Sequence, residues 1–414
     1  MQLNSIHKIQ IDSLAFGGEG VGRIDGMVAF VPFAAQGETM EIEIVEVKKK
    51  YCRGIIKKII SPSLSRIVPQ CRYYEICGGC QYQHLAYQEE LAVKQQQVRD
   101  VFERIGKIKD VKIREIIPSP RETHYRCKST FHIGRDNNGN PVMGFRPEKS
   151  REVVDIEQCE IAAEEINKSL KKFKADLRNK NPEFIPESLT LWSNWQYDET
   201  ELEIPRKFIV RRIREKSIKV PAGGFFQANE LLIEQLLSLV EEKTGLKGNE
   251  ILLDAYCGSG LFSLFLAEKA GLIYGIEQDS QAANCAIHNC RKAGGSARVK
   301  IIEGDAANII KYKLLKEDVK IDTALIDPPR TGCEERALYN LSLLKPRKIL
   351  YLSCNPATQA RDTKYLVSQG YALNELQPLD MFPRTKHIEV LAEMERREDA
   401  GCKIQDIRIT DNRK

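Results

Sequence analysis

The chain has 414 residues, a length that corresponds to roughly two to four domains. Hydrophobic residues make up 42% and charged residues 29%, which supplies enough apolar material for buried cores and an ordinary charge content for a globular protein. No apolar run approaches the roughly 20 residues that span a bilayer, and the N-terminus has no apolar signal core. We therefore expect a cytoplasmic protein without a membrane segment.

Charge and cysteine content limit the partners to expect. The net charge of +5 is mildly basic, so it permits nucleic-acid binding through local patches without requiring it. Lysines and arginines gather between residues 48 and 58 and again between residues 206 and 219, and each cluster is either a phosphate-binding surface or a solvated face. The 12 cysteines of a cytoplasmic chain indicate metal ligands, catalytic thiols or buried side chains rather than disulfides.

Residues 1 to 60 predict a small β-barrel. Glycine-rich turns separate short runs with strand character, among them Met27–Val31 and Met40–Val47, of which the second alternates apolar with acidic residues. Several short strands in so little chain are typical of a barrel. Gly18, Gly20 and Gly22 are interpreted as hairpin glycines rather than a phosphate loop, because no helical pattern follows them.

The region from residue 61 to residue 224 predicts a central α+β domain with a metal site. It begins with a Ser-Pro-Ser linker, and a helix is expected from Ala86 to about Ile105. The expected metal ligands are four cysteines, of which three cluster in sequence: Cys71, Cys77, Cys80 and Cys159. Four thiolates suit either zinc or an iron–sulfur cluster, and the three-plus-one spacing favours the cluster while leaving both open.

From residue 225 to residue 414 the pattern changes to strands that alternate with helices. This predicts βαβ units and a parallel sheet, so that the whole chain is a multidomain α/β protein with a Rossmann-like C-terminal domain. The charged tail from Glu395 is expected to be partly disordered.

A cofactor site is predicted where the strands of this domain end. A glycine turn joins the strand Ile251–Asp254 to a helix expected over Leu261–Lys269, and glycine lets a ligand approach the backbone closely. Glu277 ends the second strand, where an acid can accept both hydroxyls of a ribose, and Asp305 follows the third, where a carboxylate could receive an adenine amino group. The pattern Asp-x-x-x-Gly-x-Gly resembles class I S-adenosylmethionine methyltransferases, whereas the glycine fingerprint of the alternative, an NAD-binding fold, is missing.

Cys354 is the candidate nucleophile. It lies in a Ser-Cys-Asn-Pro turn after the apolar strand Lys348–Leu352, and Asp327 opens an Asp-Pro-Pro-Arg loop after a neighbouring strand. C5 of uracil is a poor nucleophile, but a thiolate added to C6 gives C5 enolate character, so that C5 can attack a methyl donor. In isolation the residue would be a buried structural thiol; its place at a strand end beside the acid-prolyl loop favours catalysis.

The same chemistry needs a base that removes the C5 proton so that the thiol can leave. Glu389 in His-Ile-Glu-Val is the candidate, and His387 could share the role. The alternative for Glu389 is a solvated side chain.

Five segments in the C-terminal half resemble the RNA uracil-5-methyltransferase family, in the family's order. They are Gly224–Asn229, Asp254–Gly260, Asp327–Arg330, Ser353–Pro356 and His387–Val390. The resemblance implies that S-adenosylmethionine is the methyl donor and that it is contacted by four residues, with Asp305 a weaker candidate: Gln227, Tyr256, Glu277 and Asp327. It also implies Cys354 as nucleophile and Glu389 as proton acceptor.

The N-terminal half extends the resemblance. Residues 1 to 60 resemble a TRAM domain, an RNA-binding barrel whose lysines would contact phosphates. The sequence after Cys80 resembles the branch of the family in which such cysteines hold a [4Fe-4S] cluster. This resemblance favours 23S rRNA as the substrate. The cysteine motif of radical enzymes is absent from the sequence, so the cluster is expected to be structural or to shape the RNA site. The family has asparagine at the position of Cys127, which weakens the case for RNA contacts there. Phe131, His132 and Phe145 are either stacking platforms for flipped bases or core residues.

We therefore expect methylation of C5 of a uridine in RNA by a monomer with three parts, residues 1–60, 61–224 and 225–414. The target is 23S rRNA or, alternatively, tRNA. An RNA cytosine-5-methyltransferase would carry Pro-Cys where this chain has Asp-Pro-Pro-Arg, and an amino-methyltransferase would leave Cys354 unused. A redox-sensing RNA-binding module without catalysis is the alternative from another class.

Overall fold

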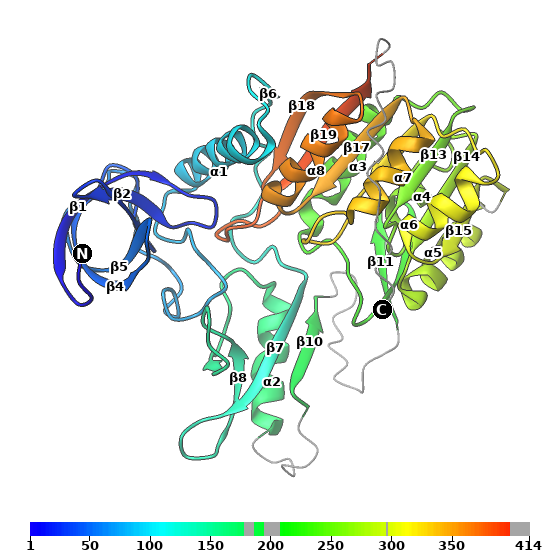
Figure 1. Ribbon diagram of the computed structural model, residues 1–414. Helices are drawn as coiled ribbons and strands as arrows, with labels where there is room; N and C mark the ends of the chain where they lie inside the picture. Colours follow the sequence, from blue (N-terminus) through cyan, green and yellow to red (C-terminus); the bar gives the residue numbers. More distant parts are fainter. Residues whose placement is uncertain (178–185, 194–207, 295–296, 398–414) are drawn as a thin grey trace, which may run out of the picture. The chain divides into compact units, whose positions relative to one another are not determined.

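The computed structural model describes residues 1–177, 186–193, 208–294 and 297–397. Residue contacts divide the chain into two compact units whose segments interleave in sequence (Figure 1). Unit 1 consists of Met1–Val101, Glu115–Leu236 and Pro378–Glu389, and unit 2 of Phe102–Arg114, Leu237–Gln377 and Val390–Lys414. Among the described helices, none combines the length and apolar character needed to cross a membrane.

The N-terminal part of unit 1 is a closed barrel, as predicted, with strand order β1-β2-β3-β5-β4. Its strands are β1 (Ile6–Leu14), β2 (Gly20–Ile24), β3 (Met27–Val31), β4 (Thr39–Val47) and β5 (Tyr51–Ser61). The alternation expected in β4 is present: Met40, Ile42 and Ile44 are buried in the barrel core. The hairpin interpretation of the glycines is also confirmed, because a Cβ on Gly22 would come within 2.2 Å of the carbonyl oxygen of Gln10 on the neighbouring strand.

The central part of unit 1 combines two long helices with two small sheets. The predicted helix over residues 86–105 is found as α1 (Tyr87–Val101), and the chain then enters unit 2 with a π-helical turn, η1 (Phe102–Gly106). A four-stranded sheet has the order β10-β7-β8-β9, and β11 pairs with β12 in a hairpin. The bounds are β7 (Lys128–Arg135), β8 (Pro141–Phe145), β9 (Val154–Asp155), α2 (Glu164–Leu177), β10 (Ser188–Trp192), β11 (Phe208–Ile213), β12 (Lys216–Pro221) and η3 (Glu230–Leu232). Apolar side chains of α2 pack on the four-stranded sheet.

Unit 2 is built on an eight-stranded sheet of order β15-β14-β13-β16-β17-β19-β18-β6. The strands are β6 (Lys112–Ile113), β13 (Ile251–Ala255), β14 (Leu272–Glu277), β15 (Val299–Glu303), β16 (Thr323–Ile326), β17 (Lys348–Ser353), β18 (Tyr371–Leu379) and β19 (Glu389–Arg396). The first five in spatial order are mutually parallel, and β19 is antiparallel to β17. The predicted alternation of strands and helices is therefore confirmed. The remainder of the charged tail, from residue 398, lies outside the described residues.

The helices of unit 2 connect these strands. They are α3 (Ile233–Thr244), α4 (Leu261–Leu266), α5 (Ser280–Lys292), α6 (Ala306–Ile309), the π-helical η5 (Ile310–Leu315), α7 (Glu335–Leu344) and α8 (Pro356–Ser368). Helix α5 packs against β14 and β15, and α8 packs against β17. The helix expected to reach Lys269 ends earlier, at Leu266. Because parallel strands end at the same edge, the loops after β13, β14, β15, β16 and β17 share one edge of the sheet.

Candidate active site

The glycine turn between β13 and α4 has a backbone that few residues adopt. Gly258 and Gly260 have φ of 55° and 79°, and Tyr256, which is not a glycine, has φ of 65°. Residues other than glycine pay a strain energy in this region, and such strain clusters at functional sites. Asp254 links the strand before the turn to the helix after it, because its Oδ2 accepts hydrogen bonds from Ser263 N at 2.9 Å and Ser263 Oγ at 2.6 Å. Burial, opposed by these bonds, raises the pKa of Asp254 to about 7.

Glu277, at the end of β14, is fixed next to the glycine turn. Its Oε2 accepts a hydrogen bond from Gly258 N at 2.8 Å and its Oε1 accepts one from Asp279 N at 2.7 Å. The adjacent strand ends are joined as well, because Cys257 N donates to Ile276 O at 3.0 Å. The carboxylate is only half-buried, and each of its oxygens has a second acceptor direction. It can therefore serve as an acceptor for a diol while it braces the turn.

Asp305 and Asp327 follow the next two strands along this edge. Asp305 caps α6, where its side chain accepts from Asn308 N at 2.9 Å, so the carboxylate already has a structural task. Asp327 N donates to Ala255 O at 3.3 Å. Burial, together with the charge of Asp254, raises the pKa of Asp327. A cationic ligand at this edge would favour the ionised form of Asp327.

Cys354 follows β17 in a turn that is tied to the Asp-Pro-Pro-Arg loop. Asn355 caps α8 through its side chain, and its Nδ2 donates to Arg330 O at 3.0 Å. Ser353 Oγ accepts from Asn355 N at 3.1 Å and tightens the turn. Cys354 itself is partly exposed rather than enclosed in the apolar interior, so the alternative of a buried structural thiol does not describe it.

Glu389 opens β19, and the register of the sheet relates it to Cys354. Ser353 is paired with Val390 in the antiparallel ladder between β17 and β19. Cys354 follows Ser353 in the chain, and Glu389 precedes Val390, so each is the next residue beyond the same pair. The side chain of Glu389 belongs to a residue that is only 3% exposed. The alternative of a solvated glutamate is therefore wrong. His387 is half-buried, with its ring 5.7 Å from that of Phe382.

Gln227 lies in unit 1, buried in the segment that connects β12 with η3. The segment is anchored by Cys127, whose Sγ donates to Gln227 O at 3.4 Å and whose N donates to Ala228 O at 2.8 Å. Cys127 is fully buried, so it supports the segment that carries Gln227 and does not contact RNA. The sequence comparison with the family's asparagine at this position gave no sign of this supporting role.

Each unit contains buried polar side-chain atoms that could bind a polar ligand. Gln227 Oε1, Asp254 Oδ1 and Ser259 Oγ are buried and have no hydrogen-bond partner among the described residues. Buried polar atoms without partners cost free energy unless a ligand or water satisfies them. All three belong to segments that resemble cofactor motifs. The amino and hydroxyl groups of S-adenosylmethionine could donate hydrogen bonds to such acceptors.

The four predicted metal-ligating cysteines line one cavity of unit 1. The cavity is lined by Tyr73, Tyr74, Gly79, Gln83, Arg126, Phe145, Ile156, Gln158, Glu160, Ile161 and the thiols of Cys71, Cys77, Cys80 and Cys159. Burial raises the pKa of Cys77 to about 11 and that of Cys80 to about 12. Among the described residues, no group of three or more His, Cys, Asp or Glu side chains is arranged to hold a single metal ion.

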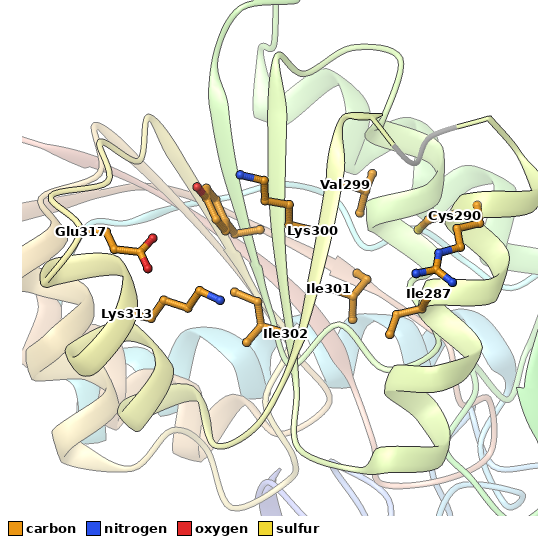
Figure 2. A pocket seen from close by; sticks show the side chains of 10 residues that line it. Ile287, Cys290, Val299, Lys300, Ile301, Ile302, Lys313 and Glu317 are labelled. Carbon is orange, nitrogen blue, oxygen red and sulfur yellow. The ribbon is translucent and has the colours of Figure 1, made fainter.

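A second hollow of about 540 Å³ lies along the outer edge of the sheet in unit 2 (Figure 2). Its apolar lining includes a valine and two isoleucines of β15 and Ile287 of α5, and three cations and one acid also line it: Arg291, Lys300, Lys313 and Glu317. No predicted site residue lines it.

The structure decides one of the alternatives left open for RNA contacts. Phe131 is buried in the core of the four-stranded sheet, and the partly buried Phe145 packs against it with 4.9 Å between ring centroids, so Phe131 is a core residue. The basic cluster around residues 48–58 is partly neutralised, because Arg53 pairs with Glu19 and Glu46. In the second cluster Arg211 is buried and paired with an acid, and residues 206 and 207 lie outside the described residues.

Comparisons with known proteins agree with these observations. Residues 198–397 match the family model described as tRNA (Uracil-5-)-methyltransferase, and residues 2–57 match the TRAM domain. An uncharacterized RNA methyltransferase of Clostridium tetani is 32% identical over 94% of this chain and 96% of its own length. One from Caldanaerobacter subterraneus is 34% identical over 96% of this chain and 99% of its own length. Among solved structures, the Pyrococcus abyssi tRNA (uracil-54, C5)-methyltransferase in complex with S-adenosyl-L-homocysteine is 25% identical with a TM-score of 0.67, covering 94% of this chain and 100% of that chain.

Proposed function

Because the chain belongs to the RNA (uracil-5-)-methyltransferase family, we propose that it methylates C5 of a specific uridine through a covalent adduct of Cys354. The observation that carries the proposal is the register of β17 and β19: Cys354 and Glu389 are each the next residue beyond the Ser353–Val390 pair. A nucleophile and a base at the same end of two adjacent strands can act on C6 and C5 of one ring.

The steps follow from this placement. The target base leaves its stack, and the Cys354 thiolate adds to C6. The electron pair that this places on C5 attacks the methyl group that bound S-adenosylmethionine would supply; the bond between that methyl group and sulfur would break, and S-adenosylhomocysteine would leave. Glu389 then takes the C5 proton, the C5–C6 double bond re-forms, and the C6–S bond breaks to release the thiolate. We assign Gln227, Tyr256, Glu277 and Asp327 to cofactor binding, with Asp305 less favoured because it already caps α6.

Two variants test this reaction. Cys354→Ala should abolish turnover with labelled S-adenosylmethionine and RNA, whereas activity at the wild-type rate would refute the covalent route. Glu389→Gln should form the methylated adduct but fail to release it, so that RNA remains attached to the protein on a denaturing gel. A freely dissociating methylated product from Glu389→Gln would remove its assigned role.

The proposed RNA is 23S rRNA, because the sequence after Cys80 resembles the cluster-bearing branch of the family. The second candidate is tRNA, because the similar Pyrococcus abyssi enzyme is a tRNA (uracil-54, C5)-methyltransferase. Mass-spectrometric mapping of 5-methyluridine in both RNAs, from cells with and without the gene, separates the two. Loss of the modification from tRNA alone would refute the rRNA proposal.

We further propose that Cys71, Cys77, Cys80 and Cys159 hold a [4Fe-4S] cluster. The four cysteines line one cavity of unit 1, and their three-plus-one spacing in the sequence favours a cluster over zinc, whose sites more often use two Cys-x-x-Cys pairs. A [4Fe-4S] cluster takes four cysteine thiolates, one for each iron. The absorbance spectrum and iron content of the anaerobically purified protein test the assignment; stoichiometric zinc without iron would refute it.

A further inference from the structure

In unit 1 the segment Cys71–Tyr82, called the cysteine loop below, is hydrogen-bonded to the segment Asp380–Ile388 that leads to Glu389. Arg384 O accepts from Gln81 N at 2.9 Å and from Tyr82 N at 3.1 Å. The side chain of Gln81 then spans the two loops: its Oε1 accepts from Lys386 N at 2.9 Å, and its Nε2 donates to Gly78 O at 3.1 Å. Gln81 directly follows Cys80, and Lys386 lies three residues before Glu389.

Helix α1 holds the first part of the same loop. Lys94 Nζ donates to Asp380 Oδ1 at 2.7 Å and to Phe382 O at 3.1 Å, and Arg384 N donates to Glu90 Oε1 at 2.7 Å. These contacts fix residues 380–384 from the helix, whereas Gln81 holds the backbone at Lys386. The amide of Gln81 is half-buried, so its two hydrogen bonds are partly shielded from water, which strengthens them.

From this geometry we infer that Gln81 is a positioning residue for the proposed base. The inference rests on the proposed function, because it concerns the step in which Glu389 removes the C5 proton. A base acts only within hydrogen-bond reach, about 2.6–3.2 Å, of the proton it takes. Attack by Cys354 and transfer of the methyl group do not use Glu389. A displaced backbone at Lys386 therefore slows release of the adduct and leaves its formation almost unchanged.

The inference gives the cysteine loop a task in catalysis that is independent of electron transfer. The proton passes from C5 to the Glu389 carboxylate and the electron pair of the C5–H bond forms the double bond as the thiolate leaves, so no oxidant or reductant takes part. A metal at the cysteines would stiffen the loop that carries Gln81, which in turn holds Lys386. The inference stands for either metal, because the hydrogen bonds of Gln81 are made by the chain itself.

Three substitutions isolate the amide. Gln81→Leu keeps the approximate shape but removes the acceptor for Lys386 N and the donor to Gly78 O. Gln81→Glu keeps an acceptor for Lys386 N and loses only the donor. Gln96→Leu is the matched control, because Gln96 is exposed on α1 and its Nε2 binds Asp100 Oδ1 at 2.8 Å, away from the loop.

Single-turnover experiments with the full chain, substrate RNA and labelled S-adenosylmethionine measure adduct formation and release separately on denaturing gels. Gln81→Leu should release the adduct on the order of 10- to 100-fold more slowly, with adduct formation and S-adenosylhomocysteine affinity within about 2-fold of wild type. Gln81→Glu should restore most of the release rate, and Gln96→Leu should match wild type.

The reference variant Glu389→Gln distinguishes two kinds of failure. If Glu389→Gln traps the adduct but Gln81→Leu does not, the positioning role is wrong and the proposed reaction stands. The positioning role is also wrong if Gln81→Leu slows adduct formation and release equally, or if Gln81→Glu stalls as Gln81→Leu does. If neither the wild type nor Glu389→Gln forms any adduct, the proposed reaction itself fails.

Discussion

Replacing Lys94 by methionine should destabilise unit 1 and make its stability depend on pH. The Lys94 side chain is completely buried between two carboxylates, with Nζ 2.8 Å from Glu90 Oε1 and 2.7 Å from Asp380 Oδ1. Burial alone would lower the pKa of Lys94, but Asp380 and Glu90 outweigh this and raise it, so the ammonium group stays charged. Methionine fills a similar volume and removes only the charge, which leaves Glu90 with Arg384 as its ion-pair partner and Asp380 with the hydrogen bond from the Tyr87 hydroxyl.

The expected magnitude follows from this burial. Removing one partner of a buried ion pair costs about 3–5 kcal/mol, because the remaining charge is left uncompensated. The fold can reduce the cost by protonating a carboxyl. Burial already raises the pKa of Glu90 to about 7 in the wild type, and loss of the opposing Lys94 charge would raise it further. The stability linked to such a group is present below its ordinary pKa near 4.5 and is lost as pH rises through the folded pKa, so the variant should differ most from wild type above about pH 7. At pH values where the folded variant binds one proton more than the folded wild type, the unfolding free energy of the variant should fall by about 1.4 kcal/mol per unit of rising pH, relative to wild type.

Urea unfolding followed by tryptophan fluorescence measures this effect, because Trp192 and Trp195 both fall within the sequence range of unit 1. The double variant Lys94→Met with Asp380→Asn should recover part of the loss, and Lys171→Met, on the exposed face of α2, should stay within about 0.5 kcal/mol of wild type. A deficit below about 1 kcal/mol at pH 8, or one that does not change between pH 5 and pH 8, would refute the reasoning.

Three further outcomes are expected. Glu277→Gln should weaken binding of S-adenosylhomocysteine about 10-fold or more by calorimetry, because a charge-assisted acceptor of about 1.5–3 kcal/mol becomes a neutral one; unchanged affinity would exclude Glu277 as a ribose ligand. Gly275→Ala should lower the stability of unit 2 by about 1–3 kcal/mol in thermal melts, because the new Cβ would lie 2.5 Å from Ile301 Cδ1; an unchanged melting temperature would contradict that packing. Burial tends to raise the pKa of Glu375, but hydrogen bonds, led by the one from Lys243, outweigh it and lower the pKa to about 2. The stability that Glu375 contributes is therefore present above pH 4.5 and is lost as pH falls towards 2. Glu375→Gln should destabilise unit 2 at pH 7 and have the same unfolding free energy as wild type near pH 2, and a constant difference across that range would count against the ion pairs.

The strands of unit 2 could be predicted from the sequence because their signal is local. Runs such as Thr323–Ile326 are apolar throughout, as strands buried on both faces are, and turn or acidic residues end them. The side chains expected at one edge, from Tyr256 to Cys354, follow from the rule that parallel strands end together. The barrel was predictable for the same reason, since its alternating pattern fixes which side chains enter the core.

Long-range partners could not be predicted in this way. Nothing near Lys94 in the sequence shows that it pairs with Asp380, which is 286 positions away, and burial of a lysine runs against its ordinary preference. Cys127 was obscure because its function is a backbone anchor for Gln227, which is 100 positions away. Phe131 could be a ligand platform or a core residue on sequence alone, and only the partners contributed by α2 decide that it is core.

The interleaving of the two units constrains how the protein can be made. Unit 1 needs residues 378–389, and unit 2 needs residues 102–114, whose short strand β6 pairs with β18 at the edge of the large sheet. A ribosome must therefore have synthesised nearly the whole polypeptide before the N-terminal unit can close around its last segment. For the same reason, dividing the chain into two fragments anywhere between residues 114 and 378 would give an N-terminal fragment without the 378–389 segment of unit 1 and a C-terminal fragment without the 102–114 segment of unit 2.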